Sequence, residues 1–342
     1  MKRKIFLGIL AVILIALVWN YKLVDYGLAQ ARGQLHIIWN ARPVEEVLND
    51  STVADSIKSK LLLIQEIRQY AIDSLGLNDT DNYTTLFDQK GKPVLWVVTA
   101  SEPYALKAKK WGFPIIGSFS YKGFFNKERA IKEKNKLTEE GWDTGIRTAG
   151  GWSTLGWFKD PILSNMLRRS EGDLANLIIH ELTHGTIFVK DQLEFNENLA
   201  TFIGDMGARK FLRQKYGYSS KEYTKYDQGE TDEKRFIRYI LKGADALDSL
   251  YQTFDDSNSI ESKKLKKEEL IDKIANSLDT VSFYNTSRYQ RVFEKRKPNN
   301  TYFMSYMRYR SKQSELKNQF ETEFNGNLGA FIDFMKEKYP FL

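Results

Sequence analysis

The stretch that decides the fold is residues 170–184, Ser-Glu-Gly-Asp-Leu-Ala-Asn-Leu-Ile-Ile-His-Glu-Leu-Thr-His. The apolar run in its middle is typical of a buried helix, and Ser170 with Asp173 three positions later predicts the N-terminal cap. On this helix His180 and His184 lie on the same face, because residues four positions apart stand one above the other. The stretch holds two of the three histidines in the chain, so a chance pairing explains it poorly.

Two imidazoles at this spacing can bind one metal ion, and the pattern favours zinc, whose bonds to histidine nitrogen are about 2.0–2.1 Å long. Glu181 stands next to the first histidine. A carboxylate in this place can take a proton from a water molecule that zinc has made acidic and pass it to a leaving amine. The pattern therefore predicts a zinc metallopeptidase, with His180 and His184 as ligands and Glu181 as general base and then acid.

A catalytic zinc site needs a third protein ligand and one open position. The remaining histidine, His36, lies far upstream beside an apolar N-terminal run, and an ordinary place in an amphipathic helix explains it better. A carboxylate is therefore expected. Glu197, at the start of a second helical pattern, is the best candidate, and Asp191 and Glu194 in the connection before it are its competitors.

The pair Asn196-Glu197 after the histidine motif resembles the gluzincins, the thermolysin-like clan, in which the third ligand is a glutamate on the following helix. The resemblance implies a zincin-like fold with one zinc ion per chain. Members of that clan commonly have an aspartate one turn after the ligand glutamate, whereas this chain has Thr201. The hydroxyl of Thr201, or the carboxylate of Asp205, is the expected substitute for orienting a zinc-bound imidazole.

Further short segments are spread over residues 26–215, among them Gln30-Ala31-Arg32-Gly33, Phe113-Pro114-Ile115-Ile116-Gly117, Ser153-Thr154-Leu155-Gly156-Trp157-Phe158 and Val189-Lys190-Asp191. They are similar to the bacterial family of predicted aminopeptidases, and Asn299-Asn300 and Tyr309 match its pattern further on. The resemblance implies release of N-terminal amino acids from peptide substrates. Gly112 and Ser118 stand where many relatives have a cysteine pair, a departure that does not touch the metal site.

Peptide cleavage passes through an oxyanion, which metallopeptidases usually stabilise with a tyrosine or histidine beside the metal. Since no histidine is left, a tyrosine is expected. Tyr309, in the family-like C-terminal segment, is the candidate, and Tyr302 and Tyr306 are its rivals. A packed aromatic face would explain these tyrosines equally well.

The substrate itself is expected to pair with an extended segment before the histidine helix. Trp152, Ser153 and Thr154 occupy the place where zincin folds have an edge strand above the metal, and such a strand can pair with a peptide backbone. An aromatic loop with a purely structural role is the alternative for this segment.

Composition fits an ordinary folded enzyme, with 42% hydrophobic and 28% charged residues. The chain contains no cysteine, so disulfide bonds are excluded. A formal net charge of +7 is explained by lysines that alternate with acidic residues, as between Glu261 and Glu269. No basic stripe interleaved with aromatic residues is present, and nucleic acid is therefore not an expected partner.

The N-terminus predicts a membrane segment, because Lys2-Arg3-Lys4 precedes an uncharged apolar run from Ile5 to Trp19. We expect a retained single-pass anchor over residues 1–24. The positive charge before the run would place the rest of the chain outside the cytoplasm, in the periplasm or cell envelope. A cleaved signal peptide is the alternative, although Ala29-Gln30-Ala31, the nearest cleavage-like sequence, lies well past the run.

The remaining pattern predicts an α+β fold, mainly helical with a small mixed sheet, in one zincin-like peptidase domain over residues 25–342. Its first part, residues 25–215, is expected to hold the sheet and the metal-site helices, and residues 216–342 a helical C-terminal part. Helices are expected at 54–75 and 127–140, strands at 94–100, 113–121 and 143–148, and a break in the later helices at 255–258.

The sequence therefore predicts a membrane-anchored zinc metallopeptidase. Aminopeptidase activity rests on the family resemblance alone, since the Gly-x-Met-Glu-Asn element of the better-known gluzincin aminopeptidases is missing. A cell-envelope endopeptidase, and a catalytically silent zinc-stabilised scaffold that binds peptides, are the alternatives.

Overall fold

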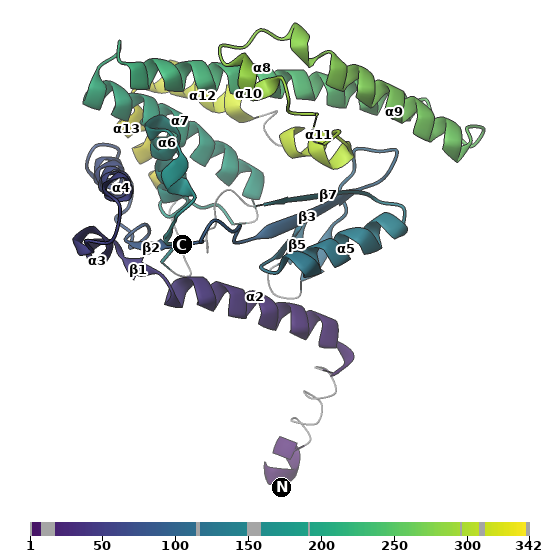
Figure 1. Ribbon diagram of the computed structural model, residues 1–342, viewed down its shortest axis with the longest axis horizontal. Coiled ribbons are helices and arrows are strands. Elements are labelled where there is room, and N and C mark those ends of the chain that lie inside the picture. Colours follow the sequence, from purple (N-terminus) through teal and green to yellow (C-terminus); the bar gives the residue numbers. More distant parts are fainter. Residues whose placement is uncertain are drawn as a thin grey trace.

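The computed structural model describes residues 2–7, 18–113, 117–148, 159–190, 192–294, 296–307 and 312–339. In this part the chain is mainly helical, as expected (Figure 1). The longer helices are α2 (Tyr21–Trp39), α4 (Asp55–Asp73), α5 (Lys127–Glu139), α6 (Glu171–His184), α7 (Leu193–Tyr216), α8 (Lys221–Gln252), α9 (Ile260–Asn276), α12 (Lys312–Phe324) and α13 (Leu328–Lys338). The shorter helices are α3 (Val44–Asn49), η1 (Met166–Arg168), η2 (Leu278–Thr280), α10 (Thr286–Tyr289) and α11 (Asn300–Met307).

The described strands form three small sheets. Their bounds are β1 (Arg42–Pro43), β2 (Thr85–Phe87), β3 (Trp96–Ser101), β4 (Trp111–Phe113), β5 (Gly117–Phe119), β6 (Lys122–Phe124), β7 (Asp143–Thr148) and β8 (Ile162–Leu163). The first sheet has the order β1-β2-β8 and is mixed, the second has the order β6-β3-β7 and is antiparallel, and β4 and β5 form a separate antiparallel pair.

The antiparallel sheet matters most for the site because two helices cover its opposite faces (Figure 1). Strand β3 runs through its centre and pairs with β7 from Trp96 opposite Thr148 to Ser101 opposite Asp143. Helix α5 packs on one face and α11, from the C-terminal part of the chain, packs on the other. A segment some 150 positions downstream of the sheet in the sequence therefore forms a wall beside it.

Helix α6 lies in the largest apolar core, between α4, α7 and α8. Five of its apolar residues are fully buried: Leu174, Ala175, Ile178, Ile179 and Leu182. The predicted cap is confirmed, since the Ser170 hydroxyl accepts a hydrogen bond of 3.2 Å from the amide of Asp173. The helix ends at His184, so the whole histidine motif lies on its last turns.

Most elements expected from the sequence are confirmed, including α4, α5 and β7 and the break between α8 and α9. The strand expected at 113–121 is wrong. The chain forms β4 and β5 there, and because these pair antiparallel it reverses direction between them. Gly117 has a φ of +84°, a left-handed conformation that a glycine adopts without strain.

The N-terminal helix α2 is docked on the domain by its polar and small residues. The Tyr26 hydroxyl and the Gln30 amide both donate to the carbonyl oxygen of Gly123, each at 2.8 Å. Gly33 lies so close to the Phe125 ring that a Cβ there would stand 2.2 Å from a ring carbon. In the described part of the chain no helix is long and apolar enough to cross a membrane, and residues 8–17, the centre of the expected anchor, lie outside that part.

Candidate metal centre

The structure brings the three predicted ligands together where α6 and α7 meet. The Nε2 atoms of His180 and His184 are 3.2 Å apart. Glu197, on the second turn of α7, places one carboxylate oxygen 3.7 Å from the first imidazole and the other 3.5 Å from the second. The candidate ligand atoms all lie within 4.8 Å of one another.

These separations fit one tetrahedral zinc ion. Around an ion with bonds of about 2.0–2.2 Å, two corners of a tetrahedron stand roughly 3.3–3.6 Å apart. The distance of 3.2 Å between the two Nε2 atoms is close to one edge of such a tetrahedron, and each oxygen of Glu197 lies at a similar distance, 3.7 or 3.5 Å, from one of the imidazoles. Two imidazoles and one carboxylate are also a donor set that catalytic zinc sites use.

Two glycines of α7 allow the helices to approach this closely. A Cβ on Gly204 would stand 3.0 Å from the backbone oxygen of Asn176 and 3.2 Å from the Cβ of His180. A Cβ on Gly207 would stand 3.0 Å from the side chain of Ile179. Larger residues at these positions would push α7 away from α6, and Glu197 with it.

Both imidazoles are held in the neutral form that a metal ion requires. Burial, together with the neighbouring His184, lowers the pKa of His180 to about 3. Burial also lowers the pKa of His184 to about 4. The exposed fractions of their side chains are 18% and 8%, against 52% for Glu197, so the site opens to solvent on the glutamate side.

Glu181, the predicted general base, is partly buried beside the candidate ligands. Burial, together with the negative charges of Glu197 and Asp160, raises its pKa to about 8. A cation held by the three ligands would act in the opposite direction, because positive charge nearby favours the ionised carboxylate. Burial and the metal together would thus bring this carboxylate into the range where it can both accept and release a proton near neutral pH.

Asp160 and Tyr83 lie close to Glu181 and were not expected from the sequence. Asp160 is 2% exposed, and its backbone is fixed by hydrogen bonds with the Asn82 side chain and the Tyr83 amide. Tyr83 has a φ of +63° and a fully buried hydroxyl without a hydrogen-bond partner among the described residues. Burial and the charges of Glu181 and Asp160 raise the pKa of this tyrosine. No motif marks either residue, because only the fold brings residues 83 and 160 to the histidine helix.

Among the described residues, the outer partners expected from the sequence do not bond to the imidazoles. The Nδ1 atom of His184 is buried without a hydrogen-bond partner among the described residues. Asp205 instead accepts hydrogen bonds from Arg209, at 2.9 Å, and from Lys234, at 3.2 Å. In the described part of the chain neither Thr201 nor Asp205 bonds to an imidazole nitrogen, so these contacts do not give either residue the orienting role.

Other predicted site residues are placed as follows. Glu194 lies in the first turn of α7 rather than in the connection before it. Tyr302 and Tyr306 place their hydroxyls 3.5 Å apart and pack among aromatic rings, which favours the structural explanation for them. The remaining predicted residues, Asp191, Tyr309, Trp152, Ser153 and Thr154, lie outside the described residues.

Comparison with known families adds to this geometry. Residues 25–338 match the family described as "Putative aminopeptidase". The chain belongs to this family. Among curated proteins and among solved structures no match was found. The family match begins within α2 and ends at the last residue of α13, so it covers every helix and strand from β1 to α13.

A cavity of about 580 Å³ begins at the exposed side of the candidate metal centre, where Glu197 lines it. Glu194, Glu197 and Asn198 of α7 line it on one side. The other sides of the cavity are lined by residues of β3 and β7 and by residues in the range 296–307, around α11. The volume lies within the roughly 300–1,000 Å³ of ligand-binding pockets, so the candidate ligand Glu197 faces a space that can hold a substrate.

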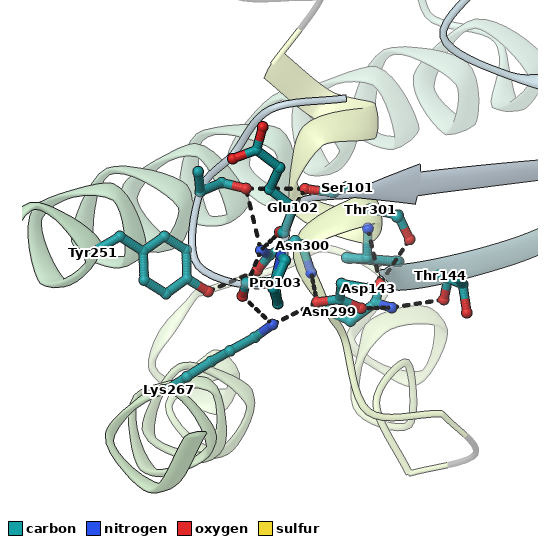
Figure 2. Close-up of polar contacts among 12 residues, drawn as sticks. Ser101, Glu102, Pro103, Asp143, Thr144, Tyr251, Lys267, Asn299, Asn300 and Thr301 are labelled. Atoms are coloured by element: carbon teal, nitrogen blue, oxygen red, sulfur yellow. Dashed lines mark hydrogen bonds and ion pairs between the residues drawn. The ribbon is translucent and has the colours of Figure 1, made fainter. Parts of the chain in front are cut away.

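A polar network fixes the α11 wall of this cavity (Figure 2). The side-chain amide of Asn299 donates to Asp143 and to the carbonyl of Thr144, at 2.6 and 2.8 Å. The buried Asn300 donates to the carbonyl of Glu102 at 2.9 Å and accepts from the Tyr251 hydroxyl at 2.7 Å. The family-like pair Asn299-Asn300 thus holds α11 against the sheet.

Proposed function

We propose that this chain is a zinc-dependent peptidase that hydrolyses peptide bonds and releases N-terminal amino acids. The observation that carries the proposal is the convergence of His180, His184 and Glu197, whose candidate ligand atoms lie within 4.8 Å of one another, beside the partly buried Glu181 and at the mouth of a substrate-sized cavity. Membership of the aminopeptidase family supports the same reaction.

Each residue of the centre has a separate role in the proposal. His180, His184 and Glu197 hold the ion. When bound, zinc supplies Lewis-acid chemistry, which polarises the scissile carbonyl and makes water more acidic. Glu181 takes the proton of the attacking water and delivers it to the leaving nitrogen, which suits a carboxyl group whose pKa burial has raised.

The exopeptidase part of the proposal depends on charge at the cavity mouth. Glu194 lies three positions before Glu197 on α7, so both carboxylates project from the same side of the helix and both line the cavity. Negative charge beside the metal attracts the ammonium group of a peptide N-terminus. An N-terminal residue would then lie at the ligands, and the first peptide bond would be the one that is cleaved.

The proposal also keeps the chain at the membrane, with residues 1–24 as an anchor and the metal centre in the periplasm or cell envelope. The charge pattern of Lys2-Arg3-Lys4 before the apolar run supports this placement.

The test uses the full chain in detergent, loaded with zinc and incubated with a mixed peptide library, with mass spectrometry of the new ends. The matched variants are Glu181→Gln and, as a surface control, Glu139→Gln on α5. We expect wild type and the control to remove single N-terminal residues and Glu181→Gln to remove none. Internal cuts would make the protein an endopeptidase. Bound zinc without any cleavage would favour a silent peptide-binding scaffold.

A further inference from the structure

The cavity beside the metal centre carries charges of both signs on different walls. Carboxylates come from α7, at Glu194 and Glu197. Guanidinium groups come from Arg147 on β7 and from Arg296, in the segment that leads to α11. Both arginines are exposed to solvent and line the same cavity.

The arginine wall is fixed in place by the fold. Arg296 donates from Nη1 to the carbonyl oxygen of Ile146 at 2.7 Å, which ties it to the residue directly before Arg147. Three positions further on, Asn299 bonds to the start of the same strand. A Cβ on Gly145 would stand 2.4 Å from the Thr301 hydroxyl, so a glycine is needed for α11 to lie this close. The guanidinium of Arg296 and the strand that carries Arg147 are therefore held on the cavity wall formed by the sheet and α11.

Between the charged walls the lining is largely apolar, with Leu106, Met304 and Met307 among its residues. Apolar side chains suit the side chains of a peptide, and arginine suits a carboxylate, to which its planar fork can donate two parallel hydrogen bonds. A molecule with an ammonium group at one end and a carboxylate at the other would meet complementary charge at both. A short unblocked peptide has this charge distribution.

We propose that Arg147 and Arg296 bind the C-terminal carboxylate of short peptides whose N-terminus lies at the metal ligands. This inference rests on the proposed peptidase function and narrows it, because it makes free short peptides the substrate class. Long chains and peptides with a blocked C-terminus lack a carboxylate at this place and bind more weakly.

The test compares peptides of two to six residues, each made as the free acid and as the C-terminal amide, with the zinc-loaded full chain. We expect the amide to raise KM by roughly tenfold or more for the peptides that fit, since a hydrogen bond to a charged group contributes about 1.5–3 kcal/mol, while kcat changes little. In the double variant that combines Arg147→Gln and Arg296→Gln, the acid and the amide of each peptide should have the same KM. The amount of zinc bound per chain should be unchanged. Lysine at both positions should restore part of the preference. Arg238→Gln, an exposed change on α8, is the control.

Calorimetric binding of the same peptides to the Glu181→Gln protein separates this inference from the proposed function. If the acid binds more tightly than the amide but the wild-type protein cleaves neither, the carboxylate subsite is supported and the proposed peptidase activity is contradicted. If the acid and the amide are both cleaved with equal KM, the carboxylate subsite is contradicted and the peptidase activity is supported. A preference for the acid over the amide that remains after both arginines are replaced would also contradict the carboxylate subsite. The absence of both peptide binding and peptide cleavage would contradict it as well. If only peptides with acidic side chains bind more tightly, the arginines bind a side-chain carboxylate, and the proposal of a C-terminal carboxylate is contradicted.

Discussion

The metal centre and the cavity wall opposite it are built in different ways. His180 and Glu197 are 17 positions apart on consecutive helices, so local sequence places all three ligands. The wall depends on contacts such as that between Asp143 and Asn299, which are 156 positions apart. The residues that we propose for the chemistry are therefore visible in a short motif, whereas those that we propose to select the substrate depend on the complete fold.

The largest effect should follow from removing a ligand. His184→Ala or Glu197→Ala should lower bound zinc from about one ion per chain to near zero, because two ligands seldom hold zinc in a catalytic site. Metal analysis after dialysis against a weak chelator measures this. Glu194→Ala, on the preceding turn of α7, should keep its zinc, and loss of metal from that variant would make Glu194 the third ligand.

A smaller effect is expected where the two helices touch. Gly204→Ala places a Cβ against the Asn176 backbone and His180, and such overpacking typically costs about 1–3 kcal/mol of unfolding free energy. Zinc affinity should fall as well, because α7 carries Glu197. Gly229→Ala is the matched control, since nothing lies within 4 Å of its added Cβ and alanine favours helix by about 1 kcal/mol. Equal stability and zinc affinity in the two variants would show that the close approach is unimportant.

The wall can be loosened without touching the metal. Asn300→Ala leaves the Tyr251 hydroxyl and the Glu102 carbonyl without their buried partner, which should cost about 1–3 kcal/mol in a urea titration. KM for peptides should rise while the zinc content stays at the wild-type level. Asn318→Ala, on the exposed side of α12, serves as the control. If zinc binding fell together with KM, the two regions would not be separate.

The smallest effect concerns the pH profile. The charge of Asp160 raises the pKa of Glu181, so Asp160→Asn should lower that pKa. A base with a lower pKa stays ionised at lower pH, and the acidic limb of kcat/KM should therefore move to lower pH by a fraction of a unit to about one unit. Asp256→Asn, in an exposed loop, should leave the limb in place. A shift in the opposite direction would contradict the coupling.

These two regions also show how far sequence reasoning reaches. The helix of His180, its cap at Ser170 and the strand at 143–148 follow from patterns within a few residues, and the structure confirms them. The hairpin of β4 and β5 was missed because both strands lie in one apolar stretch. Asp160, Tyr83 and the arginine wall carry no local signal, since each gains its neighbours only when distant segments meet.

The central claim is that His180, His184 and Glu197 bind one zinc ion. Anomalous scattering at the zinc absorption edge, from crystals of the zinc-loaded chain, tests it most directly. We expect one strong anomalous peak about 2.0–2.2 Å from the two histidine Nε2 atoms and from a carboxylate oxygen of Glu197. A zinc-containing crystal whose anomalous peak lies on other residues, or whose peak keeps its place in His184→Ala, would contradict it.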